Sequence, residues 1–388
     1  MPSMRSASTA LVFQAACVHA FWLGIKVVIG YRALELGAGP AYLGLLATAF
    51  AVPALLTSIP VGRVTDRLGG AGAASVGLLV NVGGTVLALL GRDTTTLLVA
   101  ALVMGLGQQV VMVGQQTFVA HAGAGSEAAF GTLTAASSIG QAVGPPVATA
   151  ALALVTGALS GTDAALLACL AFLLPALGAA PPLIRRDRVV QAARTDSRAS
   201  ATTSRQLLAI PGMWRSLVVS GAVLVTLDLL YAFIPVWATE QGVDPHTVGL
   251  LLALRAVVSL VSRVGLSRLV ARFGRGPLIL VSCLAGAAAL VALPLSGVAG
   301  AVVAMVGLGV ALGLPQPLTM AWVTALSPPS AHGAALGLRL TANRLAQVSL
   351  PALVGVTLGS FGVVGVFWAN ALLLTAAVTG LIGRGGRG

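Results

Sequence analysis

The sequence predicts an all-α membrane protein of about twelve transmembrane helices, arranged as two pseudo-symmetric six-helix bundles. Charged residues make up only 8% of the 388 residues and hydrophobic residues 57%, whereas a soluble domain carries about 25% charged residues. Apolar segments recur at the length of about 20 residues that a helix needs to cross a bilayer. The second half of the chain also repeats the first. Helices alone are expected, because backbone groups in lipid must be hydrogen-bonded within their own segment.

Twelve apolar segments are expected to span the bilayer. They run at 11–34, 41–62, 73–91, 95–119, 129–157, 163–184, 213–238, 247–266, 277–296, 299–326, 333–359 and 361–383. One long polar run lies between the sixth and seventh segments and has the low hydrophobicity and high charge of a flexible linker. The predicted domains are an N-terminal bundle at 1–184, a cytoplasmic linker at 185–212 and a C-terminal bundle at 213–388.

Arginine placement predicts the orientation, because loops on the cytoplasmic side carry an excess of basic residues. With the N-terminus inside, the cytoplasmic segments hold Arg5, Arg63, Arg67, Arg185, Arg186, Arg188, Arg194, Arg198, Arg205, Arg215, Arg268, Arg272, Arg275, Arg384 and Arg387. The opposite side holds Arg32 and Arg92. The net charge of +12 therefore reflects topology and predicts no nucleic-acid partner. We expect a monomer in the inner (cytoplasmic) membrane, with both termini cytoplasmic.

The two halves align when residue n is set beside residue n + 205. The matched pairs include charged residues, glycines and prolines: Glu35 with Glu240, Gly37 with Gly242, Pro40 with Pro245, Arg63 with Arg268, Arg67 with Arg272 and Gly69 with Gly274. A second block matches at n + 206: Gly131 with Gly337, Gln141 with Gln347 and Pro145 with Pro351. Apolar sequence of low complexity rarely matches at such residues in one register, so the halves are parallel copies.

A motif after the second segment carries a family resemblance. It reads Gly62-Arg63-Val64-Thr65-Asp66-Arg67-Leu68-Gly69, and a degenerate copy with Arg268 and Arg272 follows the eighth segment. Together with two six-helix halves and a central linker, it resembles the loop 2–3 signature of the major facilitator superfamily. The resemblance implies that Asp66 pairs with a nearby arginine and lies against the N-terminal dipole of the eleventh helix, which holds the outward-open state. A plain loop salt bridge is the alternative.

The fifth segment contains Gly140-Gln141-Ala142-Val143-Gly144-Pro145-Pro146. This run resembles the antiporter motif of the superfamily, although the two glycines expected just beyond it are Ala148 and Thr149 here. Gly140 and Gly144 lie one helical turn apart, so a neighbouring helix can approach closely. Ala101 occupies the approximate place where many proton-coupled members carry an arginine, which weakens a direct transfer of their proton relay.

Asp228 is the one acid well inside a predicted span, near the middle of the seventh segment. A charge at the centre of a bilayer costs about 2.5–3.5 kcal/mol on insertion scales, so Asp228 is expected to face the interior or water and to bind a proton. Lys26 lies at a comparable depth in the first segment. The two are predicted to form the proton-coupling pair. The alternatives are a structural role for Asp228 and a Lys26 side chain that extends outward to the interface.

Other polar and aromatic residues inside the spans are predicted to line a substrate cavity. They are Arg255, Arg339, Asn343, Gln115, Tyr231 and Trp22. The arginines favour recognition of an anionic or polar substrate. Cytoplasmic gating, helix-to-helix hydrogen bonds and core packing remain open for the same residues.

The resemblance and these residues together predict a secondary active transporter that works by alternating access. Proton-coupled efflux of a small organic compound is the first interpretation, and proton-coupled uptake of an organic anion is the second. A non-transporting membrane receptor or scaffold on the same fold is the alternative of another class. An enzyme is not expected, because no nucleophile, base or metal cluster recurs at a plausible depth. No cofactor or metal is expected, and the partners are a small-molecule substrate, H+ and the lipid bilayer.

Overall fold

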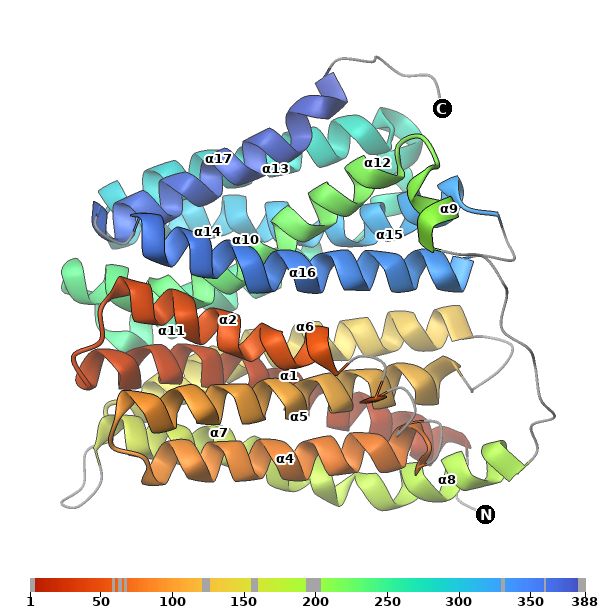
Figure 1. Cartoon of the computed structure of the whole chain (residues 1–388), viewed down its shortest axis with the longest axis horizontal. Coiled ribbons are helices and arrows are strands. Elements are labelled where there is room, and N and C mark those ends of the chain that lie inside the picture. The colour runs from red at the N-terminus through yellow and green to blue at the C-terminus, as the bar shows by residue number, and fades with distance from the viewer. Residues whose placement is uncertain are drawn as a thin grey trace. The chain divides into compact units, whose positions relative to one another are not determined.

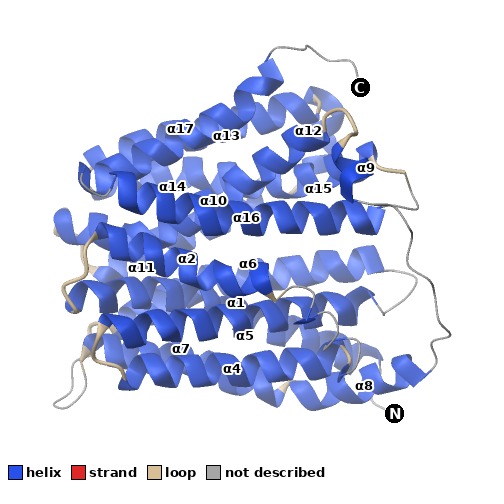
Figure 2. Ribbon diagram, in the orientation of Figure 1, coloured by secondary structure: helices blue, strands red, loops and turns tan. Residues whose placement is uncertain are grey.

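In the residues that it describes, a computed structural model of the chain consists of helices joined by turns and loops, with no strand (Figures 1 and 2). The described residues are 4–57, 60, 61, 65, 68–120, 126–154, 160–192, 204–328, 332–358 and 361–382. This confirms the all-α class predicted from the composition. Helices satisfy their backbone polar groups within the segment, as a lipid environment requires.

Each predicted span corresponds to a helix or to a pair of consecutive helices. The first half contains α1 (Met4–Glu35), α2 (Pro40–Leu56), α4 (Gly70–Leu90), α5 (Thr94–Ala120), α6 (Ser126–Ala151), α7 (Gly161–Gly178) and α8 (Ala180–Ala192). The second half contains α9 (Ser204–Leu208), α10 (Met213–Glu240), α11 (Pro245–Val261), α12 (Leu266–Phe273), α13 (Arg275–Ala292), the 3-10 helix η1 (Leu293–Leu295), α14 (Val298–Gly313), α15 (Pro315–Leu326), α16 (His332–Leu358) and α17 (Gly362–Ile382).

Some segment boundaries differ from the prediction. The eighth span was predicted to run straight through 247–266, but α11 ends at Val261 and the chain bends by 65° into α12. Gly265, just before α12, has φ +74°, which a residue with a side chain rarely adopts. Among the described residues, eight helical segments are long and apolar enough to cross a membrane, or nine when α11 and α12 count as one bent span. Residues 185–192, predicted as linker, belong to α8.

The sequence repeat is also a repeat of backbone conformation. Helices α2 and α11 begin and end in the same register, 205 residues apart, at Pro40–Leu56 and Pro245–Val261. Gly69 and Gly274 precede α4 and α13 with nearly identical angles, φ +79° and ψ 162° against φ +78° and ψ 163°. Both glycines are required by their positive φ. The two halves therefore share their turns as well as their helices.

The chain forms two compact units. Unit 1 comprises Met1–Ala38, Ala49–Asp196 and Asp244–Ala253, and unit 2 comprises Gly39–Thr48, Ser197–Val243 and Leu254–Gly388. Compared with the predicted bundles, unit 1 includes the beginning of α11, where a Cβ on Gly249 would collide with Thr149 of α6. Unit 2 includes the beginning of α2, where Thr48 Oγ1 donates a hydrogen bond to the Val348 carbonyl of α16 at 3.3 Å.

Helices α1 and α10 are the central helices of their units. Of the eight candidate spans, they are the most buried, at 72% and 78% of the apolar window, whereas the other six are 33–61% buried. Phe21 and Ile25 of α1 and Tyr231, Phe233 and Trp237 of α10 have no exposed surface. A polar side chain in the buried middle of either helix therefore lies inside protein and needs a hydrogen-bonding partner there.

Candidate functional site

The main polar cluster of unit 2 is built around the middle of α10. Asp228 and Tyr231 lie three residues apart and therefore on one face of the helix. The Asp228 side chain is 7% exposed and Tyr231 is fully buried. Their polar atoms meet side chains of α11 and α16, described below. Two separate contacts thus involve this face of α10: Asp228 with Gln347, and Tyr231 with Arg255. Asp228, Tyr231 and Arg255 are predicted functional residues, and Gln347 is the repeat counterpart of Gln141.

Asp228 is linked to α16. Gln347 Nε2 donates a hydrogen bond to Asp228 Oδ2 at 2.6 Å, and Arg344 Nη1 donates to Gln347 Oε1 at 3.0 Å. The Arg344 guanidinium is also within electrostatic reach of the Asp228 carboxylate. One buried acid therefore has an amide donor and a cation beside it, which offsets the cost of keeping a charge away from water.

Tyr231 is linked to α11. Arg255 Nη2 donates a hydrogen bond to Tyr231 Oη at 3.1 Å, and the guanidinium carbon lies 5.6 Å from the centroid of the ring. Arg255 is 1% exposed, and its Nε has no hydrogen-bond partner among the described residues. A fully buried arginine is thus held by a neutral hydroxyl and an aromatic ring.

Arg339 and Asn343 are the predicted cavity residues on α16, and Arg339 contacts the beginning of α15. Arg339 Nη2 donates hydrogen bonds to Gln316 Oε1 at 2.9 Å and to Thr319 Oγ1 at 3.2 Å. Asn343 is buried, and its Oδ1 has no partner among the described residues. These contacts join α16 to α15.

Lys26 lies over aromatic rings of unit 1. Its Nζ is 4.8 Å from the centroid of Trp22 and 6.0 Å from that of Phe50, and the two rings meet edge to face at 5.3 Å. Such placement stabilises an ammonium group by cation–π attraction. The predicted pairing of Lys26 with Asp228 is not tested by these contacts and stays a prediction.

The two cation–aromatic pairs occupy equivalent positions of the repeat. Lys26 corresponds to Tyr231, and Phe50 corresponds to Arg255, each 205 residues apart. The cation is on the first helix of the repeat in unit 1 and on the second helix in unit 2. Both halves therefore keep a cation against an aromatic ring at the same pair of positions, with the roles exchanged.

Gln115, predicted as a cavity residue, joins three helices inside unit 1. Its Nε2 donates to Gln14 Oε1 at 3.2 Å, and Gln14 Nε2 donates to the Ala176 carbonyl at 3.2 Å. Helices α5, α1 and α7 are tied together in this way. Gln115 Oε1 has no partner among the described residues.

The antiporter-like residues lie in the contact between α6 and α1. A Cβ added to Gly140 would collide with the carbonyl oxygen of Ala16, and one added to Gly144 would collide with that of Ala20. Pro145 is within α6, and the Thr149 hydroxyl donates to its carbonyl at 2.8 Å. The two glycines therefore permit the close approach of α1 that their spacing predicts.

The gating motif is only partly within the described residues. Gly62, Asp66 and Arg67 lie outside them. Gly69 is the residue before α4, and Arg268 and Arg272 are exposed on α12, one turn apart. Sequence reasoning missed Asp187 of α8, whose Oδ2 accepts a hydrogen bond at 2.8 Å from the Ala71 amide in the first turn of α4. A buried carboxylate at a helix N-terminus satisfies a free N–H and interacts favourably with the helix dipole.

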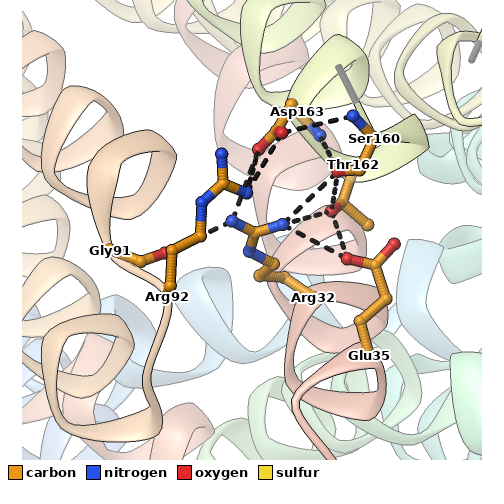
Figure 3. A network of polar contacts seen from close by, with 7 residues as sticks. All are labelled: Arg32, Glu35, Gly91, Arg92, Ser160, Thr162 and Asp163. Atoms are coloured by element: carbon orange, nitrogen blue, oxygen red, sulfur yellow. Dashed lines mark hydrogen bonds and ion pairs between the residues drawn. The ribbon is translucent and has the colours of Figure 1, made fainter. Parts of the chain in front are cut away.

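Sequence reasoning also missed a network at the far end of unit 1 (Figure 3). Arg32, at the end of α1, forms ion pairs with Glu35 and Asp163 at 3.3 Å each and donates a hydrogen bond to the Thr162 hydroxyl at 2.9 Å. Its side chain is 3% exposed and that of Asp163 is 1% exposed. Arg92 reaches Asp163 from the connection between α4 and α5, and both carboxylate oxygens accept from its Nη1 at 3.1 Å.

The network fastens three elements of unit 1 to one another. Arg32 Nη2 also donates to the Gly91 carbonyl at 3.2 Å, and Asp163 forms a reciprocal capping box with Ser160 at the start of α7. Position 237, which corresponds to Arg32 in the n + 205 register, is a tryptophan. The ion-pair network is thus specific to the first repeat. The available sequence signal was the spacing Ser160-x-x-Asp163.

Comparison with known proteins agrees with this architecture of two repeated helical halves around buried polar clusters. The Major Facilitator Superfamily model matches residues 11–299 and 224–384. The chain belongs to this superfamily, and it is a membrane transporter and not an enzyme. No curated protein matches the sequence.

Solved transporters share the fold at low sequence identity. The nucleoside transporter NupG has a TM-score of 0.74 at 12% identity, with 97% of this chain and 99% of that chain covered. A bacterial homolog of the human lysosomal transporter Spinster has a TM-score of 0.69 at 16% identity, with 98% and 95% covered. A POT family transporter in complex with a thioalcohol-conjugated peptide has a TM-score of 0.74 at 11% identity, with 97% and 95% covered.

Proposed function

We propose that the protein is a proton-coupled exporter of a small organic compound and that Asp228 is its proton-binding residue. The observation that carries the proposal is the buried Asp228 carboxylate with its Gln347 donor and the Arg344 cation nearby. Protonation would remove the charge that these donors stabilise, so the packing of α10 against α16 would depend on the proton. A ligand shifts a conformational equilibrium only through such a differential affinity.

Export is the proposed direction, supported by the run Gly140 to Pro145, which resembles the antiporter motif of the superfamily. Its glycines bring α6 against α1. A rigid pair of helices is suited to move as one body during alternating access. Lys26 is proposed to tune Asp228, and the protein is proposed to act as a monomer in the inner membrane with both termini cytoplasmic. Asp66 is proposed as the residue that holds the cytoplasmic side closed.

Flux in proteoliposomes tests the coupling and the direction together. An untargeted solute screen under an imposed pH gradient identifies the substrate. An exchanger accumulates substrate when the lumen is acidic, whereas a proton symporter accumulates it when the outside is acidic. Flux under the second gradient alone would contradict export and favour uptake, and no flux under either gradient would favour a receptor or scaffold.

Asp228→Asn tests the residue itself. It is expected to abolish gradient-driven accumulation and to leave substrate exchange at least partly intact. Glu240→Gln is the matched control, because it removes an exposed acid at the end of the same helix. Normal accumulation against a gradient by Asp228→Asn would show that the coupling residue lies elsewhere or that the protein is a uniporter.

A further inference from the structure

Two buried arginines of unit 2 form no ion pair with any residue that the structure describes. Arg255 is 1% exposed and Arg339 is 4% exposed, and the Nε of each has no hydrogen-bond partner in the described part of the chain. An uncompensated cation inside a membrane protein is expensive, and such residues commonly mark the path of a substrate or ion. An anion bound beside either arginine would neutralise this buried positive charge.

The Nη2 group of Arg339 already has hydrogen-bond acceptors within the protein. Three oxygen atoms accept from its Nη2: Gln316 Oε1 at 2.9 Å, Thr319 Oγ1 at 3.2 Å and the Gln316 carbonyl at 3.5 Å. These acceptors come from one helix, α15, so the contacts explain the position of Arg339 as a link between α16 and α15. No ligand is needed to account for it.

Arg255 is different, because among the described residues one hydrogen bond from its five N–H donors is seen, and its Nε has no partner there. That hydrogen bond is to the Tyr231 hydroxyl, which is neutral. Because the hydroxyl oxygen accepts from Arg255, the Tyr231 O–H remains available to donate to another group. The pair thus presents several donors beside one fixed positive charge.

The position and residue type of Arg255 suit a substrate. Arg255 is the eleventh residue of the seventeen in α11, and Tyr231 lies nine residues before the end of α10, so both are about 14–15 Å from the helix ends that meet at residues 240–245. This depth is near the middle of a bilayer that is about 30 Å thick. A planar guanidinium matches the two oxygens of a carboxylate, which the ammonium of Lys26 in the equivalent pair of unit 1 does not.

We infer that Arg255 and Tyr231 bind a carboxylate group of the transported compound, so that the substrates are organic anions. The inference rests on the proposed transport function and specifies its substrate class. Arg255 donates to the two carboxylate oxygens, and the Tyr231 hydroxyl donates to one of them. An amide of the same shape lacks the negative charge and leaves the guanidinium uncompensated, so it binds more weakly.

Thermal stabilisation of the purified full-length protein tests this class without any proton gradient. The probes are matched acids and amides: benzoate and benzamide, phenylacetate and phenylacetamide, indole-3-acetate and indole-3-acetamide, with sodium chloride at equal ionic strength. At least one acid is expected to raise the Tm of the wild type, and its amide and chloride are not. Arg255→Gln is expected to weaken that acid about ten- to a hundredfold, and Tyr231→Phe by less.

Further variants separate a binding role from a structural one. Arg255→Lys keeps the positive charge but loses the planar pair of N–H donors of the guanidinium, so an intermediate affinity for the acid is expected. Arg215→Gln removes an exposed arginine at the start of α10 and should leave binding unchanged. The inference is overturned if no acid stabilises the wild type, if chloride or the amides act equally, or if a folded Arg255→Gln or Arg255→Lys protein binds the acid normally.

The outcomes also separate this inference from the proposed function. Acid binding that requires Arg255, together with no gradient-driven flux, would support the anion site and contradict proton-coupled export. Flux that requires Asp228, together with a transported solute that is neutral or cationic, would support coupling and overturn the anion site.

Discussion

Gln347 Nε2 donates to Asp228 Oδ2 at 2.6 Å across 119 residues of sequence, and this contact joins the two central polar residues of α10 and α16. The amide is held from its other side by Arg344. Replacement of Gln347 therefore removes both the donor to a buried carboxylate and the link to the neighbouring cation. The relationship makes Gln347 a positioning residue for Asp228.

Gln347→Leu is expected to lower the stability of unit 2 by about 1–3 kcal/mol, because a buried charged acceptor loses its donor. It should also impair gradient-driven flux more than equilibrium exchange. Gln141→Leu is the matched control, since Gln141 is the repeat counterpart of Gln347 and the counterpart of Asp228 is Leu23. Thermal unfolding and paired flux assays measure both effects. Equal consequences for the two variants would contradict a specific role for Gln347.

Gly140→Ala and Gly144→Ala are expected to destabilise unit 1 by about 1–3 kcal/mol each, as overpacking does in a close-packed interior. The added Cβ meets backbone carbonyl oxygens of α1, which cannot turn aside as a flexible side chain can. Gly83→Ala is the control, because no atom lies within 4 Å of its Cβ, and it should be neutral or stabilising by up to about 1 kcal/mol. The Tm of the purified variants checks this, and a Tm of wild-type value for Gly140→Ala would refute the close approach.

Much of the fold could be predicted from the register of the repeat, because charged residues, glycines and prolines mark turns. Glu35 and Glu240 end α1 and α10, and Pro40 and Pro245 begin α2 and α11. The bend after Val261 could not be predicted from the sequence, because the apolar run continues through the bend and only a single glycine marks it. Hydropathy reports which residues avoid water, and it does not report where a helix turns.

The candidate site was predicted residue by residue, but not in its pairing. Arg255 and Tyr231 were both expected in a cavity, and their contact depends on how α11 packs on α10. The correspondence of Lys26–Phe50 with Tyr231–Arg255 is invisible to a comparison of identities, because the cation and the aromatic ring have exchanged positions. Long-range ion pairs such as Arg32–Asp163 also could not be predicted from the sequence, because they depend on how helices distant in sequence pack together.

Arg198→Cys and Gly388→Cys, each in a variant without native cysteines, are expected to resist a membrane-impermeant thiol reagent in intact cells. The physical reason is the positive-inside asymmetry, which predicts that the linker and both termini lie in the cytoplasm. Thr95→Cys, at an exposed position near the start of α5 on the predicted outer side, should react before lysis and serves as the control. Labelling of either cytoplasmic position in intact cells would contradict the topology.

Two exposed carboxylates outside the spans predict a local pH dependence. Hydrogen bonds from the Thr96 hydroxyl and amide hold the pKa of Asp93 below its ordinary value, and Thr247 does the same for Asp244. A depressed pKa means that each cap is complete above the unfolded value of about 3.9 and is lost as the pH falls through the lower folded value. The Thr96 and Thr247 amide chemical shifts should therefore be constant near neutral pH and change only in acid. Asp93→Asn should give a flat profile at Thr96, and a midpoint at or above 3.9 would contradict the caps.

Arg32→Met is expected to be among the most destabilising single changes in unit 1, at about 3–5 kcal/mol, because it leaves the 1% exposed Asp163 without its buried partner. Arg92→Met removes a cation from the same carboxylate, but the Arg92 side chain is 61% exposed, so about 1 kcal/mol or less is expected. The two variants share the charge change and the Asp163 acceptor, whereas Arg32 is buried and also binds Glu35, Thr162 and Gly91.

Asp163→Asn removes the negative charge but keeps a side chain that can cap α7. Its effect on stability therefore reports the loss of the charge and not the loss of the cap. A double-mutant cycle of Arg32→Met with Asp163→Asn should show a coupling energy of more than about 1 kcal/mol, since residues in one buried network do not act additively. The double variant should be less destabilised than the sum of the singles, because neither charge is then left buried and alone. Thermal or denaturant unfolding of the purified protein supplies the four values. Additive effects, or equal costs for Arg32→Met and Arg92→Met, would show that the network in Figure 3 does not hold the end of unit 1 together.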